Sequence, residues 1–321
     1  MKVQSFRRNT LLLSSIMFVL TILLTIPNAF AVPGDELADI FCDDDTESDS
    51  VGVGFDGTYL YYPRGFFATS LGVCDTDGNL FPDIPLVGLV GGDTISTISY
   101  DSSRGLFWAA TPDKGGSVRG IYQITSAGSA TFMYNVVADG ALLTDGLAYD
   151  GEDDSLWISG DVSNNIYHYD TDGTLIAGPI PIPNLPGCGN SGIASGIGVL
   201  YLGFNGCNVA QKHNKADLSF VEQYNLGTGR TEDMECDNLT FPGVDAIWTK
   251  DAYDAEMFAF EVPDGTCPVG GGGGHIVGGS ILPIDASALL IAGAFTNAVW
   301  MAPVLVGTAG IVAFYIKTRK N

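Results

Sequence analysis

The stretch DGLAYDGEDDSLWISGDVSNNIYHYDTDG, residues 145–173, contains the pattern that decides the fold of this chain. It divides into three short segments: DGLAYD ends in an aromatic residue and an aspartate, SLWISG is apolar, and NIYHYD runs into a polar turn. Short segments rich in aromatic and branched side chains, separated by Gly and Asp turns, are typical of antiparallel strands. The stretch therefore predicts one sheet unit built from hairpins.

The same pattern occurs five times along the chain. The other copies contain GVGFDG, STISYDS, SGIAS and NLTF, within 52–78, 96–128, 191–214 and 238–265. The second strand of each copy carries one aromatic residue, which we call its aromatic mark. These residues recur every 44 to 50 positions: Tyr61, Phe107, Trp157, Tyr201 and Trp248. This period is typical of a β-propeller, whose blades stack around an axis because none can bury its faces alone. The sequence predicts an all-β, five-bladed propeller over 32–268.

Closure of the ring is predicted from what the fifth copy lacks. Four copies are followed by an outer strand, around Leu80, 131–136, 174–180 and 220–226. The fifth copy runs into glycine, which weakens strands. We expect the segment from Leu37 to Cys42 to supply the missing outer edge, and the alternative is a frayed fifth blade.

The two ends of the chain predict export and membrane attachment. Residues 1–31 have a basic start, an apolar run and the small-x-small sequence Ala29-Phe30-Ala31, the pattern of a signal peptide cleaved after Ala31. A glycine-rich linker, 269–282, leads into an apolar stretch, 283–316, long enough to cross a bilayer as one helix. The basic tail 317–321 is expected to stay in the cytoplasm. The propeller is then extracellular, on a single-pass anchor in the cell membrane.

The segment PIDASALLIAGAFTNAVWMAPVLVGTAGIVAFYIKTRK, residues 283–320, resembles the C-terminal anchors of certain archaeal secreted and cell-envelope proteins. The resemblance lies in the Pro-Ile-Asp start after a glycine-rich linker and in the Trp-Met-x-Pro middle. It implies attachment to the membrane and says nothing about activity.

The charge of the exported part limits its partners. Between residues 32 and 282 there are 36 acidic and 8 basic residues, a net charge of −28. Such a surface repels nucleic acid and anionic lipid and attracts cations. A nucleic-acid partner is therefore excluded, and the membrane contact is expected only through the C-terminal helix.

All six cysteines lie in the exported part, so they predict up to three disulfides. Cys188 and Cys207 flank strands of one copy and are expected to pair. The other four are Cys42, Cys74, Cys236 and Cys267. Their spacing favours the local pairs Cys42–Cys74 and Cys236–Cys267, whereas closure of the ring would favour Cys42 with Cys267.

A ring of polar residues is the candidate functional site. In propellers the innermost strands line a central channel, and the residues predicted to open those strands are Asp49, Asp93, Asp145, Asn190 and Asp237. Converging carboxylates would raise one another's pKa or bind a cation, and oxygen ligands suit calcium, with Asp145 and Asp237 as metal ligands. The alternative is that these residues cap turns between blades. The two Asp-Thr-Asp-Gly segments, 75–78 and 170–173, are predicted as hairpin turns because they lack the further ligands of a calcium loop.

Enzyme chemistry has little support in the sequence. His168 and His213 fall on third strands, away from the axis, and His275 lies in the linker. The aromatic-Asp-Gly strand ends and the Leu-Trp second strand resemble extracellular NHL-like and lactonase-like propellers over 45–265. That resemblance implies either histidines in the channel or a cage of Glu, Asn and Asp side chains around calcium. The channel histidines are missing here, and only Asp145, Asn190 and their ring partners could form such a cage.

Two functions follow from these observations. The first is a non-catalytic binding or cell-envelope interaction module, presented outside the cell to a ligand or protein that the sequence does not name. The alternative is a calcium-dependent hydrolase or lyase of the lactonase-like kind. Asn238 begins an Asn-Leu-Thr glycosylation sequon, expected within an inner strand.

Overall fold

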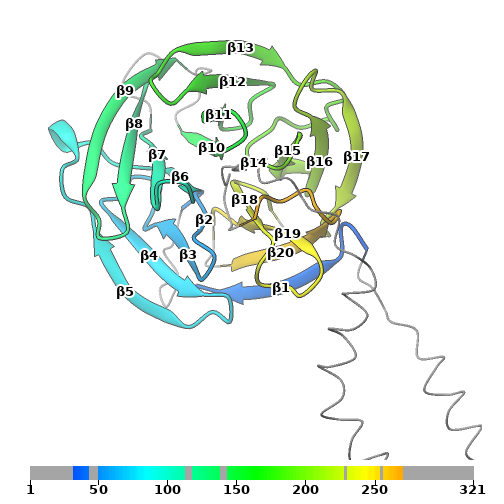
Figure 1. The fold of residues 1–321 in the computed structure, drawn as a ribbon, viewed down its shortest axis with the longest axis horizontal. Coiled ribbons are helices and arrows are strands. Elements are labelled where there is room, and N and C mark those ends of the chain that lie inside the picture. The colour runs from blue at the N-terminus through cyan, green and yellow to red at the C-terminus, as the bar shows by residue number, and fades with distance from the viewer. Residues whose placement is uncertain are drawn as a thin grey trace, which may run out of the picture. The chain divides into compact units, whose positions relative to one another are not determined.

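The computed structural model describes residues 32–42, 50–112, 118–137, 143–227, 230–253 and 256–269. Over these ranges the chain forms five four-stranded antiparallel sheets that surround a central axis, so the five-bladed propeller is confirmed (Figure 1). The described residues include no helix long and apolar enough to cross a membrane. The predicted signal peptide, transmembrane anchor and basic tail lie outside the described residues, as does Asp49.

Each of the first four blades is a continuous meander from the axis outward. Blade 1 contains β2 (Gly54–Phe55), β3 (Tyr59–Pro63), β4 (Ser70–Asp75) and β5 (Leu80–Pro85). Blade 2 contains β6 (Thr97–Asp101), β7 (Leu106–Ala110), β8 (Val118–Thr125) and β9 (Ala130–Val137). Blade 3 contains β10 (Thr144–Asp150), β11 (Ser155–Gly160), β12 (Asn165–Asp170) and β13 (Leu175–Pro181). Blade 4 contains β14 (Ile193–Ser195), β15 (Val199–Phe204), β16 (Val209–Asn214) and β17 (Phe220–Asn225).

Blade 5 combines both ends of the domain. Its inner strands are β18 (Met234–Asp237), β19 (Asp245–Lys250) and β20 (Glu256–Val262), and its outer strand is the N-terminal β1 (Glu36–Phe41). β1 pairs antiparallel with β20, with Asp39 opposite Phe258. The predicted strand exchange is therefore confirmed. In Figure 1 β1 continues the ring between β17 and β5.

The disulfides follow the local pairing. Cys42–Cys74 joins the end of β1 to β4 across the closing seam, and Cys236–Cys267 joins the last described segment to β18. Cys188–Cys207 lies within blade 4, as expected. The alternative that paired Cys42 with Cys267 is wrong, because blade 5 already closes through the pairing of β1 with β20.

A hydrogen bond between an aspartate and a tryptophan of the same blade explains why the motif recurs in blades 2, 3 and 5. The indole N–H groups of Trp108, Trp157 and Trp248 donate to the aspartates that end the inner strands of their own blades, at 3.2, 3.1 and 2.8 Å. Trp108, not Phe107, is thus the equivalent of Trp157, which corrects the predicted mark by one residue. Phe107 faces the other way, into the apolar cluster between blades 1 and 2. One such cluster lies at each blade interface, as stacked blades require.

The Asp-Thr-Asp-Gly segments form the predicted hairpin turns. They connect β4 to β5 and β12 to β13, with Gly78 at φ +82° and Gly173 at φ +92°. Backbone N–H groups of the β4–β5 turn donate to the Asp75 carboxylate. These carboxylates therefore serve turn formation.

Candidate binding site at the channel mouth

Of the predicted ring residues within the described ranges, only two lie near the starts of inner strands. Asp145 is at the start of β10, and Asn190 lies just before β14, where its backbone pairs with that of Ser163. Asp93 follows a short 3-10 turn, η1 (Val90–Gly92), and accepts a hydrogen bond from Tyr122 on β8, so it lies away from the inner strands.

Asp237 occupies the opposite end of its strand from the one expected. It is the last residue of β18, where it holds the Trp248 indole and accepts N–H bonds from Leu239 and Thr240. The fifth inner strand is therefore Met234–Asp237, and the NLTF segment taken for it is the turn that follows. Asn238 lies in that turn, partly exposed, and not inside a strand.

The inner strands have two positions at which four blades carry only small side chains. One is the residue paired with the aromatic mark of the second strand, and the other lies two residues before it. These positions hold Gly52 and Gly54, Thr97 and Ser99, Gly146 and Ala148, and Gly192 and Ala194. In blade 5 they hold Asp233 and Glu235. The side chains of Asp233 and Glu235 in blade 5 thus occupy the space near the axis that the small side chains of blades 1 to 4 leave open.

Asp233 connects blade 5 to three other blades. Its carboxylate accepts hydrogen bonds from the Val53 N–H at 3.3 Å, the Thr97 hydroxyl at 2.5 Å and the Leu147 N–H at 3.3 Å. An innermost strand has no partner on its axial edge, so its N–H groups need acceptors from elsewhere. The Asp233 side chain supplies them in blades 1 and 3.

Glu235, two residues after Asp233 on the same strand, also accepts hydrogen bonds from another blade. It accepts hydrogen bonds from the Ser99 hydroxyl and the Tyr100 N–H, both at 3.0 Å, and the Ser99 oxygen in turn accepts the Tyr149 N–H. Burial raises the pKa of Glu235 to about 8, and burial also raises the pKa of Asp233 well above its usual range. The channel interior is thus filled by a satisfied polar network.

The mouth of the channel is formed where the inner strands of blades 3, 4 and 5 begin. Asp145, Ser191 and Glu232 hold the same register position in these strands. The strands touch there: a Cβ at Gly146 would lie 2.5 Å from the Ser191 carbonyl oxygen, and the Gly192 N–H donates to the Thr231 carbonyl. The Ser191 backbone therefore lies between the inner strands that carry Asp145 and Glu232.

The two acidic groups of the mouth have different partners. Glu232 is paired with Arg230, at 2.5 Å, and accepts a hydrogen bond from the Asn205 amide. Asp145 is buried, and its hydrogen-bond neighbour is Asp161, which is exposed. Burial, followed by the charges of Asp161 and Glu232, raises the pKa of Asp145 well above its usual range.

Several buried oxygen atoms at the mouth accept no hydrogen bond from the described residues. Each belongs to a side chain that is at most 1% exposed: Asp145 Oδ1, Asn190 Oδ1, Ser191 Oγ and Thr231 Oγ1. Buried polar atoms in native proteins nearly always have a partner, and the exceptions call for a specific explanation. Blades 3, 4 and 5 each contribute to this set, which we call the unpartnered oxygens.

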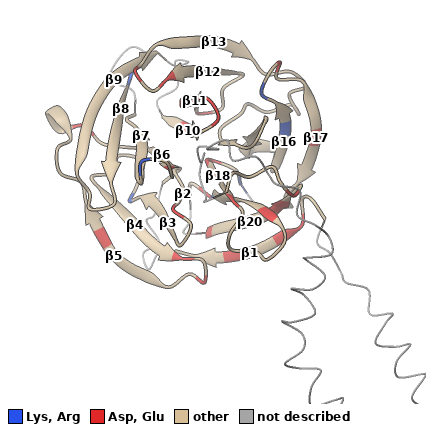
Figure 2. Ribbon diagram, in the orientation of Figure 1, with Lys and Arg blue, Asp and Glu red and all other residues tan. Residues whose placement is uncertain are grey.

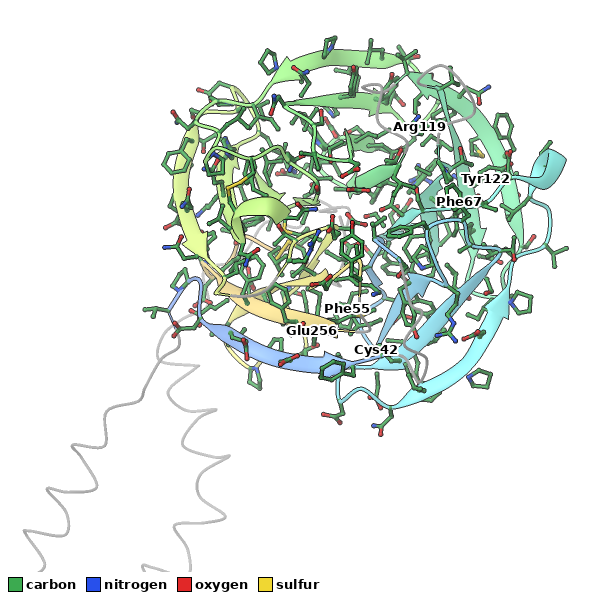
Figure 3. All side chains as sticks on the ribbon, turned by 180° about the vertical axis from the view of Figure 1, so that it is seen from behind. Cys42, Phe55, Phe67, Arg119, Tyr122 and Glu256 are labelled. Carbon is green, nitrogen blue, oxygen red and sulfur yellow. A yellow bond between two sulfur atoms is a disulfide. The ribbon has the colours of Figure 1, made fainter. Side chains whose placement is uncertain are left out.

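Apolar side chains surround the same end of the ring. The loops between second and third strands expose Phe67 (56%), Val162 (55%) and Tyr253 (63%). The Tyr253 ring carries the Arg230 guanidinium 4.6 Å from its centre and also contacts Phe66. Figure 3 labels Phe67 between the outer strands and the centre of the ring, and Figure 2 shows acidic segments beside that centre. Phe67, Val162 and Tyr253, which we call the rim of the mouth, are thus exposed apolar side chains at the same end of the ring as Asp145 and Glu232.

The described histidines serve packing. His168 on β12 stacks on Trp157 at 3.8 Å, and His213 on β16 bonds to Gln211 and the Leu218 carbonyl. Burial lowers the pKa of both rings. Ser155 and Asp153 both approach His168 at Nε2, whereas a catalytic triad uses opposite ring nitrogens. Within the described ranges no group of three or more His, Cys, Asp or Glu side chains is arranged to hold a metal ion.

Sequence reasoning missed Asp161, Glu232, Asp233 and Glu235. A signal for the last two was available, because alternate acids in DMECD occupy positions that are Gly, Ala, Ser or Thr in the other copies. Asp161 carried no such signal, since its loop differs in length between blades.

No family model matches the sequence, and no curated protein does. Among solved structures, a chain of the nidogen/laminin complex is 16% identical, with a TM-score of 0.38 over 54% of this chain and 62% of that one. The chain thus covers less than two thirds of that match. The glutaminyl cyclase of Myxococcus xanthus is 12% identical, with a TM-score of 0.49 over 71% of this chain and 97% of the other. These likenesses carry no argument about ligand or activity.

Proposed function

We propose that this chain is an exported, membrane-anchored binding module, which recognises a partner outside the cell through the channel mouth and its rim, without catalysis. The signal peptide and the C-terminal anchor supply its location. The observation that carries the proposal is the contrast between a filled channel and an open, apolar rim. Because Asp233 and Glu235 occupy the axis, a partner can reach only the face.

The rim supports recognition of a protein or another large ligand. Exposed aromatic side chains contribute much of the affinity at interfaces, because they bury a large area and lose little conformational entropy. Phe67 and Tyr253 come from blades 1 and 5 and lie on loops, where changes of sequence leave the core intact.

Site-specific photocrosslinking in the native host tests this function. A photoreactive residue placed at Phe67 is expected to form an adduct with a cell-envelope partner. The matched control is Ile176 on the outer strand β13, which is similarly exposed at 51%. Identical adducts from both positions, or none from Phe67, would contradict the proposal.

The alternative function is a calcium-dependent hydrolase or lyase. Its predicted metal ligands, Asp145 and Asp237, do not lie close enough together to bind one ion. Asp145 begins β10, whereas Asp237 corresponds in register to Asp150 at the far end. Five residues of strand separate these levels by about 16 Å, too far for one ion. The unpartnered oxygens still favour a cation beside Asp145. A calcium-dependent rise in the melting temperature that Asp145→Asn abolishes, together with turnover of a lactone, would support this alternative.

A further inference from the structure

The connection between β18 and β19 is longer than the equivalent connection of every other blade. It spans 238–244, whereas the first and second strands of blades 1 to 4 are joined by 56–58, 102–105, 151–154 and 196–198. The other blades thus reverse the chain with fewer residues, so the reversal alone does not require the extra length. The long connection reads NLTFPGV and contains the Asn-Leu-Thr sequence that begins at Asn238.

Contacts at its base hold this connection in place. The N–H groups of Leu239 and Thr240 donate to one oxygen of the Asp237 carboxylate at 2.7 and 3.0 Å, and the other oxygen accepts the Trp248 indole N–H. The Phe241 ring packs against the Trp248 ring, with centroids 5.9 Å apart. Between these two anchors Leu239 is 49% exposed. The connection is therefore a fixed turn whose beginning reaches the surface.

We propose that Asn238 is an N-glycosylation site, with an oligosaccharide attached to its side-chain amide. Asn-x-Ser/Thr is the acceptor sequence for this modification, and it is used on surface loops of exported proteins. The pattern occurs once in the sequence, because exposed asparagines elsewhere have no Ser or Thr two residues later, as at Asn79, Asn214 and Asn225. The inference goes beyond the binding function and rests only on the proposed export of the chain.

The disulfides support modification during export. All six cysteines are paired, and such bonds persist mainly in oxidising compartments outside the cytosol. One of these bonds, Cys236–Cys267, begins on β18 directly before Asp237 and the turn. The segment that carries the acceptor asparagine is thus part of a disulfide-bonded region.

The modification joins the amide nitrogen of Asn238 to the anomeric carbon of the first sugar. The co-reactant is an oligosaccharide linked through phosphate to a membrane lipid, and it is supplied by the export pathway. The bond between the anomeric carbon and the phosphate oxygen breaks, the phosphate leaves on its lipid, and the amide nitrogen loses one proton. Nothing is oxidised or reduced, and this chain supplies only the acceptor nitrogen.

The position of Asn238 keeps a glycan away from the channel mouth. β18 starts at Met234, beside the mouth, and ends at Asp237, so the turn that follows lies at the opposite face of the ring. The rim comes from connections between second and third strands, which lie at the mouth face. A glycan is bulky and solvated. At Asn238 it would shield the exposed Leu239 side chain and leave the mouth open to a partner.

Mass spectrometry of the full-length protein from its native host tests the inference. After reduction, trypsin releases Asn238 in the peptide 231–250. This peptide is expected to carry the mass of an oligosaccharide in most molecules. The peptides 65–104 and 216–230, which contain Asn79 and Asn225, are expected to carry none.

Variants separate the acceptor sequence from the fold of the turn. Asn238→Gln removes the acceptor nitrogen and Thr240→Ala removes the hydroxyl, so each is expected to abolish the modification. Thr240→Ser retains the hydroxyl and is expected to keep it. Both Thr240 variants keep the backbone N–H that donates to Asp237, so they leave the turn equally supported. Asn79→Gln, in an exposed turn of blade 1, is the control and is expected to change nothing.

Three results would overturn the inference. These are an unmodified peptide 231–250 in the wild type, a modification that survives Thr240→Ala, or a modification of the same peptide that survives Asn238→Gln. The proposed function fails separately, because the Phe67 crosslink reports on the mouth face. If the crosslink forms and the glycan is absent, only the glycosylation inference is wrong. If the glycan is present without any envelope crosslink, only the envelope partner is wrong.

Discussion

The channel interior and the channel mouth contain the same kinds of residue in different states. In the interior, the carboxylates of Asp233 and Glu235 accept hydrogen bonds from the inner strands of blades 1, 2 and 3. At the mouth, one residue further toward the face, the Asp145 and Ser191 oxygens have no such donor. The difference teaches that burial of an acid alone does not mark a binding site. The proposed binding site differs from the interior in its buried oxygens that accept no hydrogen bond.

The largest expected effect comes from removing the interior acid. Asp233→Ala leaves two backbone N–H groups and the Thr97 hydroxyl buried without an acceptor. Each such loss costs about 1 to 3 kcal/mol, so we expect a fall of about 4 kcal/mol in the free energy of unfolding. Urea unfolding of the full-length protein with its disulfides intact measures it. Asp77→Ala is the control, and a similar small change in both variants would show that the interior network is not stabilising.

The second effect is a dependence of stability on pH that belongs to the interior. The pKa of Glu235 is raised to about 8 by burial, whereas an exposed glutamate titrates near 4.3. Between these values the folded state binds more protons than the unfolded state, so stability is full below the lower value and is lost as pH rises toward 8. The slope for one fully linked proton is about 1.4 kcal/mol per pH unit.

Glu235→Gln tests that slope. The amide does not titrate, so unfolding curves recorded from pH 5 to 8 are expected to show a shallower decline than the wild type. An unchanged slope in Glu235→Gln would show that this group is ionised in the folded protein.

A smaller effect is expected at the mouth. Burial raises the pKa of Asp145 well above its usual range and so favours the uncharged acid, which Asp145→Asn replaces by an uncharged group of the same shape. The free energy of unfolding at pH 7 should change by less than about 1 kcal/mol. Thermal unfolding without ligand measures it. A loss as large as that of Asp233→Ala would erase the distinction between interior and mouth.

The smallest effect is expected from Ser191→Ala. The hydroxyl is fully buried and accepts no hydrogen bond, so its removal forfeits no contact and relieves a desolvation cost. We expect stability unchanged or raised by about 0.5 kcal/mol. A destabilisation of more than about 1 kcal/mol in urea unfolding would mean that Ser191 has a structural partner.

Much of the architecture could be predicted from local sequence. The Trp157 copy contains every element of a blade within 29 residues, and the missing outer strand pointed to β1. Blade 5 was shifted because Cys236-Asp237 lacks the aromatic residue that precedes the aspartate in blades 1 to 3. NLTF also alternates like a strand, although it forms a turn.

The site was less accessible to prediction than the fold. Asp145 could be found because it opens a well-marked strand, but Asp233 resembles a solvent-facing acid until its position is compared with glycine in the other copies. The proximity of Asp161 to Asp145 depends on the path of the connection between β11 and β12, which no periodicity encodes.

The Cys236–Cys267 bond has a mechanical consequence. A pull on the chain just after Cys267 passes through this bond to β18, the innermost strand of blade 5, which Asp233 and Glu235 tie to the blades across the axis. The load then acts on the whole ring at once and cannot unzip β20 from its end. A pull on Val32 acts instead on β1, which has no covalent cross-link before Cys42, and would peel that strand away one residue pair at a time. The described domain should therefore resist a pull applied after Cys267 better than a pull applied at Val32.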